Sequence, residues 1–144
     1  MVDIQISNLD ERGILNIEDV EKLENFAKDI CKEIGIKNKT ISIVITDSDV
    51  VSKLNKQYRD VDSTTDVLSF PLNELESHEK VLGEIVIDLD RAKLQSDEYN
   101  NSILRELSFL IMHGILHLIG YDHDKDHRGD MREKEKSLEH FLLK

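Results

Sequence analysis

Three histidines lie close together in the stretch HGILHLIGYDH, which covers residues 113–123. His113 and His117 are four residues apart, and His123 follows after a glycine at position 120. On an α-helix, residues four apart differ by about 40° in azimuth and about 6 Å in rise, so the first two imidazoles can point the same way. Gly120 can adopt the left-handed conformation that reverses the chain and would bring His123 back beneath the helix. Three neutral imidazoles suit Zn²⁺ and leave its fourth position open for water, as in a catalytic site.

The residue after the first histidine limits the kind of reaction. Two helical histidines, a glycine turn and a third histidine are similar to the pattern of zinc peptidases of the zincin type. Those enzymes carry a glutamate after the first histidine as their general base, whereas this chain has Gly114. A peptidase without that base would be badly impaired. The sequence therefore favours a metal site used for something other than peptide hydrolysis.

The elements that must position these histidines follow from the pattern of apolar residues. Asn16 is an expected N-cap, and Gly35 and Gly120 are expected helix stops. We expect strands at 3–7, 40–46, 66–70 and 82–88, and helices at about 16–34, 48–59, 89–98, 101–120 and 129–142. The end of the helix at 101–120 is apolar on most faces, which is typical of a buried helix. This order predicts one α+β domain over residues 1–144, with a mixed sheet of roughly four strands packed under a zincin-like metal helix.

Composition narrows the class of protein further. The chain has 144 residues, a formal net charge of −11 and one cysteine, Cys31. Cys31 falls at an apolar position of a predicted helix and is expected to be a small buried hydrophobic residue. The negative charge argues against general electrostatic coating of nucleic acid, although a local basic patch could still bind RNA weakly and in a salt-sensitive way. The N-terminal stretch MVDIQISNLDERG lacks the features of a secretory signal, and no apolar stretch is long enough to span a bilayer. We therefore expect a cytoplasmic protein with no membrane segment.

These motifs resemble those of one known family. HGILHLIGYDH resembles the HGxLHLxGYDH signature of the YbeY-type proteins, single-strand-specific endoribonucleases of bacterial rRNA maturation. LNKQYRDVDSTTDVLSFP at 54–71 resembles the LNxxyR…TDVLSFP block of that family, and LGEIVID resembles its next strand, with Glu84 where the family usually has aspartate. Met131 and Glu135 fall where the family has its M…E helix. The resemblance covers roughly residues 40–140.

The resemblance implies a metal-dependent hydrolase that acts on single-stranded RNA, in 16S rRNA 3′-end maturation and ribosome quality control. It implies His113, His117 and His123 as metal ligands, His113 and Arg59 as catalytic residues, and the ribosome with its proteins as partners. The metal is expected to be Zn²⁺, although three imidazoles also suit other divalent transition metals such as Ni²⁺. Whether hydroxide attacks phosphorus or a ribose 2′-OH is deprotonated stays open, and no general base is identified.

Substrate contacts are expected at the end of the second predicted helix and on the third predicted strand. The guanidinium of Arg59 can grip a phosphate through two hydrogen bonds. Lys53 and Lys56 extend this basic side of the helix, or form an ordinary solvated face. Asp66 and Ser69 could contact substrate, and Asp66 could equally be a structural cap or the partner that orients Arg59. Glu84 is expected to be a structural acid on its strand.

Two other functions compete with the nuclease. The chain could be a ribosome-assembly factor whose metal is mainly structural, which the charge of −11 slightly favours. A fourth protein ligand on the metal would support this alternative, and Asp124, Asp126 and His127 are close enough in sequence to be candidates. A metallopeptidase is the third possibility, and Gly114 disfavours it.

Overall fold

The computed structural model describes residues 2–59, 67–71, 81–121 and 131–144, with side chains described throughout these ranges except at 55, 57–59 and 67–71. The predicted strands and helices in these ranges are all present, with ends that differ from the predicted ones by a few residues. In chain order they are β1 (Asp3–Asn8), α1 (Ile17–Glu33), β2 (Thr40–Thr46), α2 (Ser48–Arg59), β3 (Val67–Pro71), β4 (Val81–Asp88), α3 (Leu89–Glu98), α4 (Ile103–Leu118), α5 (Met131–Leu138) and the 3₁₀ helix η2 (Glu139–Phe141).

The described strands form one mixed sheet in the order β1-β2-β4-β3. β1, β2 and β4 run parallel, and β3 pairs antiparallel with β4 at the edge. In this register Ile43 of β2 lies between Ile6 of β1 and Ile85 of β4. Helices lie in the connections between the parallel strands. Parallel strands need such a long crossover, because a tight turn can join only antiparallel strands. The α+β class predicted from the sequence is confirmed.

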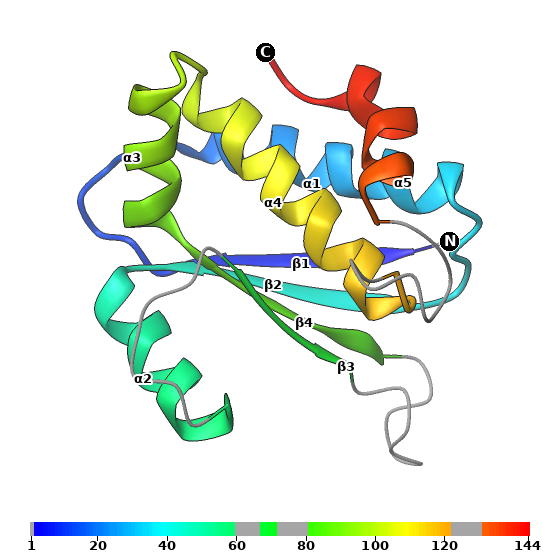
Figure 1. Cartoon of the computed structure of the whole chain (residues 1–144), viewed down its shortest axis with the longest axis horizontal. Helices are drawn as coiled ribbons and strands as arrows, with labels where there is room; N and C mark the ends of the chain where they lie inside the picture. The colour runs from blue at the N-terminus through cyan, green and yellow to red at the C-terminus, as the bar shows by residue number, and fades with distance from the viewer. Residues whose placement is uncertain (1, 60–66, 72–80, 122–130) are drawn as a thin grey trace.

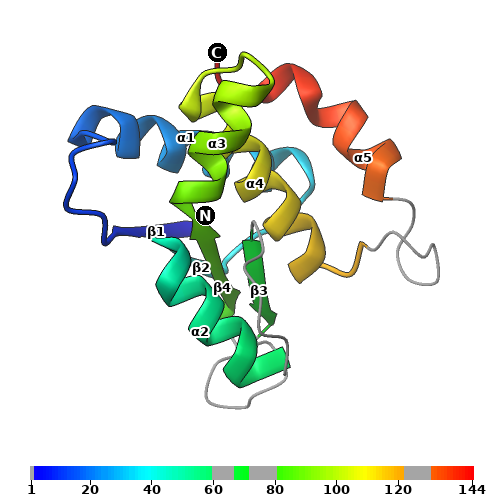
Figure 2. The same cartoon turned by 60° about the vertical axis from the view of Figure 1, so that its left-hand side comes forward.

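Helices cover both faces of the sheet. Figure 1 shows α1 and α4 on one face and α2 on the other, and Figure 2 shows the same arrangement from the side. The larger apolar core lies between the sheet and α1 and α4, and it contains Leu23, Ile30, Ile43, Ile85, Ile111 and Ile115, all fully buried. A small second core under α2 is formed by Val51 and Val86, with Val44 and Leu54 packed against it. The position of α2 on the face opposite to α1 and α4 was not predicted from the sequence.

Local capping explains where α1 begins and where α4 ends. The Asn16 side chain accepts a hydrogen bond from the backbone N–H of Asp19 at 2.8 Å, and the Asp19 carboxylate accepts one from the Asn16 N–H at 3.0 Å. This reciprocal pair satisfies two backbone donors at the start of α1. At the end of α4, Gly120 has a φ of 102°, and the Tyr121 N–H donates to the Leu116 carbonyl at 3.0 Å. The expected N-cap and the glycine stop are both confirmed.

The last helix is shorter than expected. Within the described residues α5 ends at Leu138, and the chain then tightens into η2 instead of continuing as an α-helix to residue 142. Leu143 follows, and its N–H donates to the Ser108 hydroxyl of α4 at 3.2 Å. The C-terminal segment therefore turns to pack on α4, which a straight helix would not allow. No helix in the described ranges is long and apolar enough to cross a membrane.

A polar network joins the starts of α2 and α3 at the carboxyl ends of β2 and β4. The Ser48 hydroxyl donates to the fully buried Asp88 carboxylate at 2.7 and 2.8 Å, and Asp88 caps α3 by accepting the Arg91 N–H. The Ser48 N–H donates to Asp90 at 2.9 Å, and Arg12 donates to Asp90 at 2.6 Å. Burial raises the pKa of Asp88, whereas the hydrogen bond from the Ser48 backbone lowers the pKa of Asp90.

Candidate active site

His113 and His117 form a partly exposed stripe on α4. Their ring centroids are 4.7 Å apart and the two rings are nearly perpendicular, at 79°. The two imidazoles therefore lie on the same side of the helix, as their spacing predicts. Other residues of this part of α4, including Met112, Ile115 and Leu116, are buried against the core and hold the helix in place. The role of the two histidines as metal ligands stays a prediction.

Gly114, next to His113, lies where α4 approaches β4 most closely. An ideal Cβ at position 114 would be 2.9 Å from Cγ2 of Ile85 and 3.0 Å from its Cδ1. Ile85 is fully buried in the sheet, so its side chain has little room to move. The absence of glutamate at position 114 thus has a packing cause. A zincin-type general base does not fit here.

Glu135 reaches His113 from α5. Its Oε2 lies 3.4 Å from Nδ1 of His113, and the two side chains are only 11% and 17% exposed. Glu135 belongs to the M…E helix of the resemblance, and no role was predicted for it from the sequence. Its spacing from Met131 and Leu138, four and three residues away, could have placed it on the inner face, because both of these residues are buried.

The donor set of the described residues fits a metal site in part. His113 and His117 offer two imidazoles one helical turn apart, and a carboxylate beside the Nδ1 of a ligating histidine is a common feature of zinc sites. Within the described ranges, no group of three His, Cys, Asp or Glu side chains is placed to hold an ion. His123, the expected third ligand, lies outside the described residues, as do Asp122, Asp124, Asp126 and His127.

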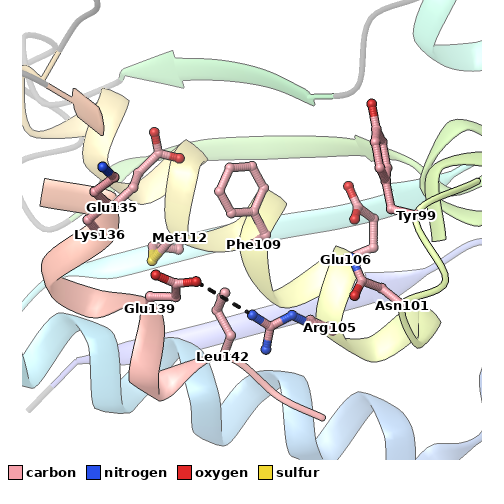
Figure 3. A pocket seen from close by; sticks show the side chains of 10 residues that line it. All are labelled: Tyr99, Asn101, Arg105, Glu106, Phe109, Met112, Glu135, Lys136, Glu139 and Leu142. Carbon is pink, nitrogen blue, oxygen red and sulfur yellow. Dashed lines mark ion pairs between the residues drawn. The ribbon is translucent and has the colours of Figure 1, made fainter. Parts of the chain in front are cut away.

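Two neighbouring cavities lie between α4 and α5, and His113 lines one of them. A cavity of about 430 Å³ is lined by Phe109, His113, Arg132, Glu135 and Lys136. A second one, of about 420 Å³, shares three of these residues and is shown in Figure 3, where Glu135 and Tyr99 lie at opposite ends with Phe109 between them. Arg105 and Glu139 form an ion pair across it at 3.9 Å. His113 thus borders a hollow surface and not a closed core.

The expected substrate-binding residues that the structure describes lie on α2 and on the edge strand β3. α2 carries the exposed Lys56 and ends at Arg59, and it covers the face of the sheet opposite to α4 (Figure 1). Ser69 is on β3, where its backbone pairs with Ile85, the residue against which Gly114 packs. The side chains of Arg59 and Ser69, and all of Asp66, lie outside the described part of the chain.

Comparison with known proteins identifies similar chains. The family model described as "Endoribonuclease YbeY" matches residues 5–142. A protein of that name from Aquifex aeolicus is 42% identical over 123 residues, which are 85% of this chain and 81% of that protein. The protein of that name from Bacillus subtilis is 38% identical over 144 residues, 92% of each chain. A solution structure of a Thermotoga maritima protein is similar with a TM-score of 0.65 and 32% identity, over 98% of this chain and 88% of that one.

Proposed function

The chain belongs to the endoribonuclease YbeY family, and from this premise we propose that it is a zinc-dependent endoribonuclease that cuts single-stranded RNA. The observation that supports the metal centre most directly is the pair of imidazoles on α4, 4.7 Å apart, with Glu135 beside the first of them. We propose His113, His117 and His123 as the ligands. Zn²⁺ suits this donor set, and Ni²⁺ is an alternative.

The proposed chemistry divides the work between the metal and the protein. When bound, Zn²⁺ would supply a Lewis acid and lower the pKa of a water molecule. His113 and His117 hold the ion in a fixed place because their helix is buried on its other sides. Arg59 binds a phosphate of the substrate and stabilises the negative charge that grows there during cleavage. Position 114 supplies no general base, since Ile85 fills the space that a side chain would need.

The arrangement of elements suggests a path for the RNA. The histidines are on α4, on one face of the sheet, and α2, with Lys56 and Arg59, is on the other face. We propose that a substrate contacting both passes over the edge strand β3, which pairs with β4. Ser69 on this strand and Asp66 just before it are the proposed contacts along the way. A flexible single strand can bend around such an edge, whereas a stiff duplex cannot. A path over this edge therefore favours single-stranded RNA as the substrate.

We propose that the substrate is rRNA, at the 3′-end of 16S rRNA, and that the protein also serves ribosome quality control in the cytoplasm. The charge of −11 makes the affinity for free RNA weak and salt-sensitive. Ribosomal or ribosome-associated proteins would then deliver the substrate, and no membrane is involved.

One cleavage experiment tests this proposal. Purified protein is incubated with a single-stranded rRNA fragment and with its duplex, and bound metal is measured in the wild type, His117→Ala, Arg59→Ala and Lys53→Ala. Lys53 is an exposed cation on the same helix as Arg59 and serves as the matched control. We expect cleavage of the single strand to be lost in His117→Ala and in Arg59→Ala, with metal retained in the latter and full activity in Lys53→Ala.

One outcome would contradict the nuclease, and another would contradict the role of Arg59 as a specific clamp. Stoichiometric metal in the wild type without cleavage of either RNA would favour the ribosome-assembly factor with a structural metal. Equal loss of activity in Lys53→Ala and Arg59→Ala would show that general charge, not a specific clamp, binds the substrate.

A further inference from the structure

We propose that Glu135 is a positioning residue: its carboxylate accepts a hydrogen bond from Nδ1–H of His113 and so presents the other ring nitrogen, Nε2, to the metal. The proposal rests on the contact of 3.4 Å between Oε2 and Nδ1. It depends on the proposed metal centre but not on the choice of RNA as substrate.

The packing of α5 holds Glu135 at this place. Met131, one turn earlier, is fully buried, and Leu138, one turn later, is 2% exposed. These two apolar residues anchor the same side of α5 on which Glu135 lies, in a helix whose other residues are all polar. The Glu135 side chain itself is only 11% exposed. A carboxylate that has lost this much hydration needs a hydrogen-bond donor, and the imidazole of His113 supplies one.

The hydrogen bond has a definite chemical consequence for His113. A neutral imidazole carries its proton on one nitrogen and its lone pair on the other, and the partner of one nitrogen selects which is which. A carboxylate can only accept, so it selects the proton on Nδ1 and the lone pair on Nε2. Nδ1 then cannot be the ligating atom.

The neighbours of His113 on α4 restrict the ring from two further directions. The Phe109 ring is one turn earlier, with centroids 6.1 Å apart and an interplanar angle of 31°. The His117 ring is one turn later and nearly perpendicular. The Phe109 ring has no hydrogen-bonding nitrogen or oxygen and so cannot select a nitrogen of His113, whereas a carboxylate can. Glu135 therefore contributes a hydrogen-bond acceptor that comes from outside α4.

Three variants of α5 distinguish a role of Glu135 in orienting the His113 ring from a role in attaching α5 to α4. Glu135→Ala removes the acceptor. Glu135→Gln keeps an acceptor oxygen at the same distance along the side chain but removes the charge. Glu133→Gln makes the same charge change on the same helix at an exposed position, so it is the matched control for Glu135→Gln.

Two measurements that do not involve RNA test the proposal. The first is the tautomer of His113, from the ring nitrogen chemical shifts in ¹⁵N NMR spectra of the metal-free protein, which distinguish a proton on Nδ1 from one on Nε2. The second is the affinity for Zn²⁺ in competition with a chelator. Thermal unfolding of each variant shows whether it is folded.

We expect the proton on Nδ1 of His113 in the wild type, in Glu133→Gln and in Glu135→Gln. Glu135→Ala should lose this preference and bind Zn²⁺ roughly 10- to 100-fold more weakly, the usual cost of losing a partner that orients a histidine ligand. Glu135→Gln should recover most of that loss.

Several results would overturn the proposal. One is a proton on Nε2 of His113 in the wild type, which needs no variant to be folded. Another is a Glu135→Ala protein in which the His113 tautomer and the Zn²⁺ affinity are both unchanged. A purely structural role of Glu135 would give that result, whether or not the melting temperature changes. If the tautomer and the affinity change as expected but the wild type cuts no RNA, Glu135 keeps its role and only the proposed nuclease function fails.

Discussion

A Cβ at position 114 would lie 2.9 Å from Cγ2 of Ile85, closer than carbon atoms of this kind approach one another. The glycine beside the first histidine is therefore required by the contact between α4 and β4. The same residue removes the general base of a zinc peptidase and lets the helix lie close on the sheet. The contact between Gly114 and Ile85 thus affects both the packing of α4 on the sheet and the residue types that can stand beside His113.

Gly114→Ala should destabilise the protein although alanine is the better helix former. The gain in helix propensity is about 1 kcal/mol, whereas overpacking a filled core typically costs about 1–3 kcal/mol. We expect a net loss of about 1 kcal/mol in the free energy of unfolding, measured by urea denaturation. Gly114→Glu should be more damaging and should not create peptidase activity.

The control for this change is the same substitution in an Ile85→Ala background. Ile85→Ala alone should cost about 2–5 kcal/mol because it leaves a cavity, but it removes the three atoms nearest to the new Cβ, which are Cγ2, Cδ1 and Cγ1 of Ile85. Gly114→Ala should then be neutral or stabilising. Strictly additive effects of the two substitutions would contradict the contact.

Zn²⁺ should stabilise the wild-type protein against heat, and the two α4 histidines should carry this effect. A ligand at about 100 times its dissociation constant stabilises the folded state by about 2.7 kcal/mol. We expect the shift in melting temperature on adding Zn²⁺ to disappear in His113→Ala and His117→Ala. It should persist in His140→Ala, because His140 is an exposed histidine on η2. An equal shift in all variants would place the metal elsewhere.

Asp88→Asn should change how stability depends on pH. Because burial raises the pKa of Asp88 above its ordinary 3.8, the folded state holds this proton more tightly than the unfolded state. The stability that protonation contributes is complete below about pH 3.8 and is lost as the pH rises through the raised pKa. Asparagine cannot ionise and can still cap α3. Relative to the wild type, Asp88→Asn should therefore gain free energy of unfolding as the pH rises above about 3.8.

Asp90→Asn should show the opposite dependence, although Asp90 belongs to the same network. Its pKa is lowered by the hydrogen bonds from Ser48 and Arg12, so its contribution to stability is present above about pH 3.8 and is lost at lower pH. The variant should be less stable than the wild type at neutral pH, and the difference should shrink as the pH falls. Urea denaturation across this range measures both variants, and parallel curves for the two would refute the assignment.

Cys31 should be inert toward thiol reagents in the folded protein. The side chain is fully buried, and burial raises the pKa of its thiol to about 12. At about pH 8 the thiolate fraction is then on the order of 10⁻⁴, and the reagent has no access to the sulfur. Reaction with an aromatic disulfide reagent, followed by absorbance, should be slow in native buffer and fast in urea. Rapid native reaction would show that the α1 side of the core opens readily.

The sequence alone determined the local structure and the pairing of the two histidines. Apolar periodicity located the helices and strands, and Asn16 and Gly120 marked helix ends, because these features depend on residues only a few positions apart. The shared direction of His113 and His117 follows from the pitch of one helix. The site roles of Arg59, Asp66 and His123 came from motifs and remain predictions.

Tertiary structure decided which distant residues meet. Glu135 lies 22 positions from His113, and only the docking of α5 on α4 brings its carboxylate to Nδ1. The need for glycine at position 114 arises from the packing of Ile85, 29 positions earlier, and the placement of α2 on the far face arises from a small core of its own. A pattern of polar and apolar residues shows which side of an element is buried. It does not show what that side is buried against, because that depends on how all the elements pack together.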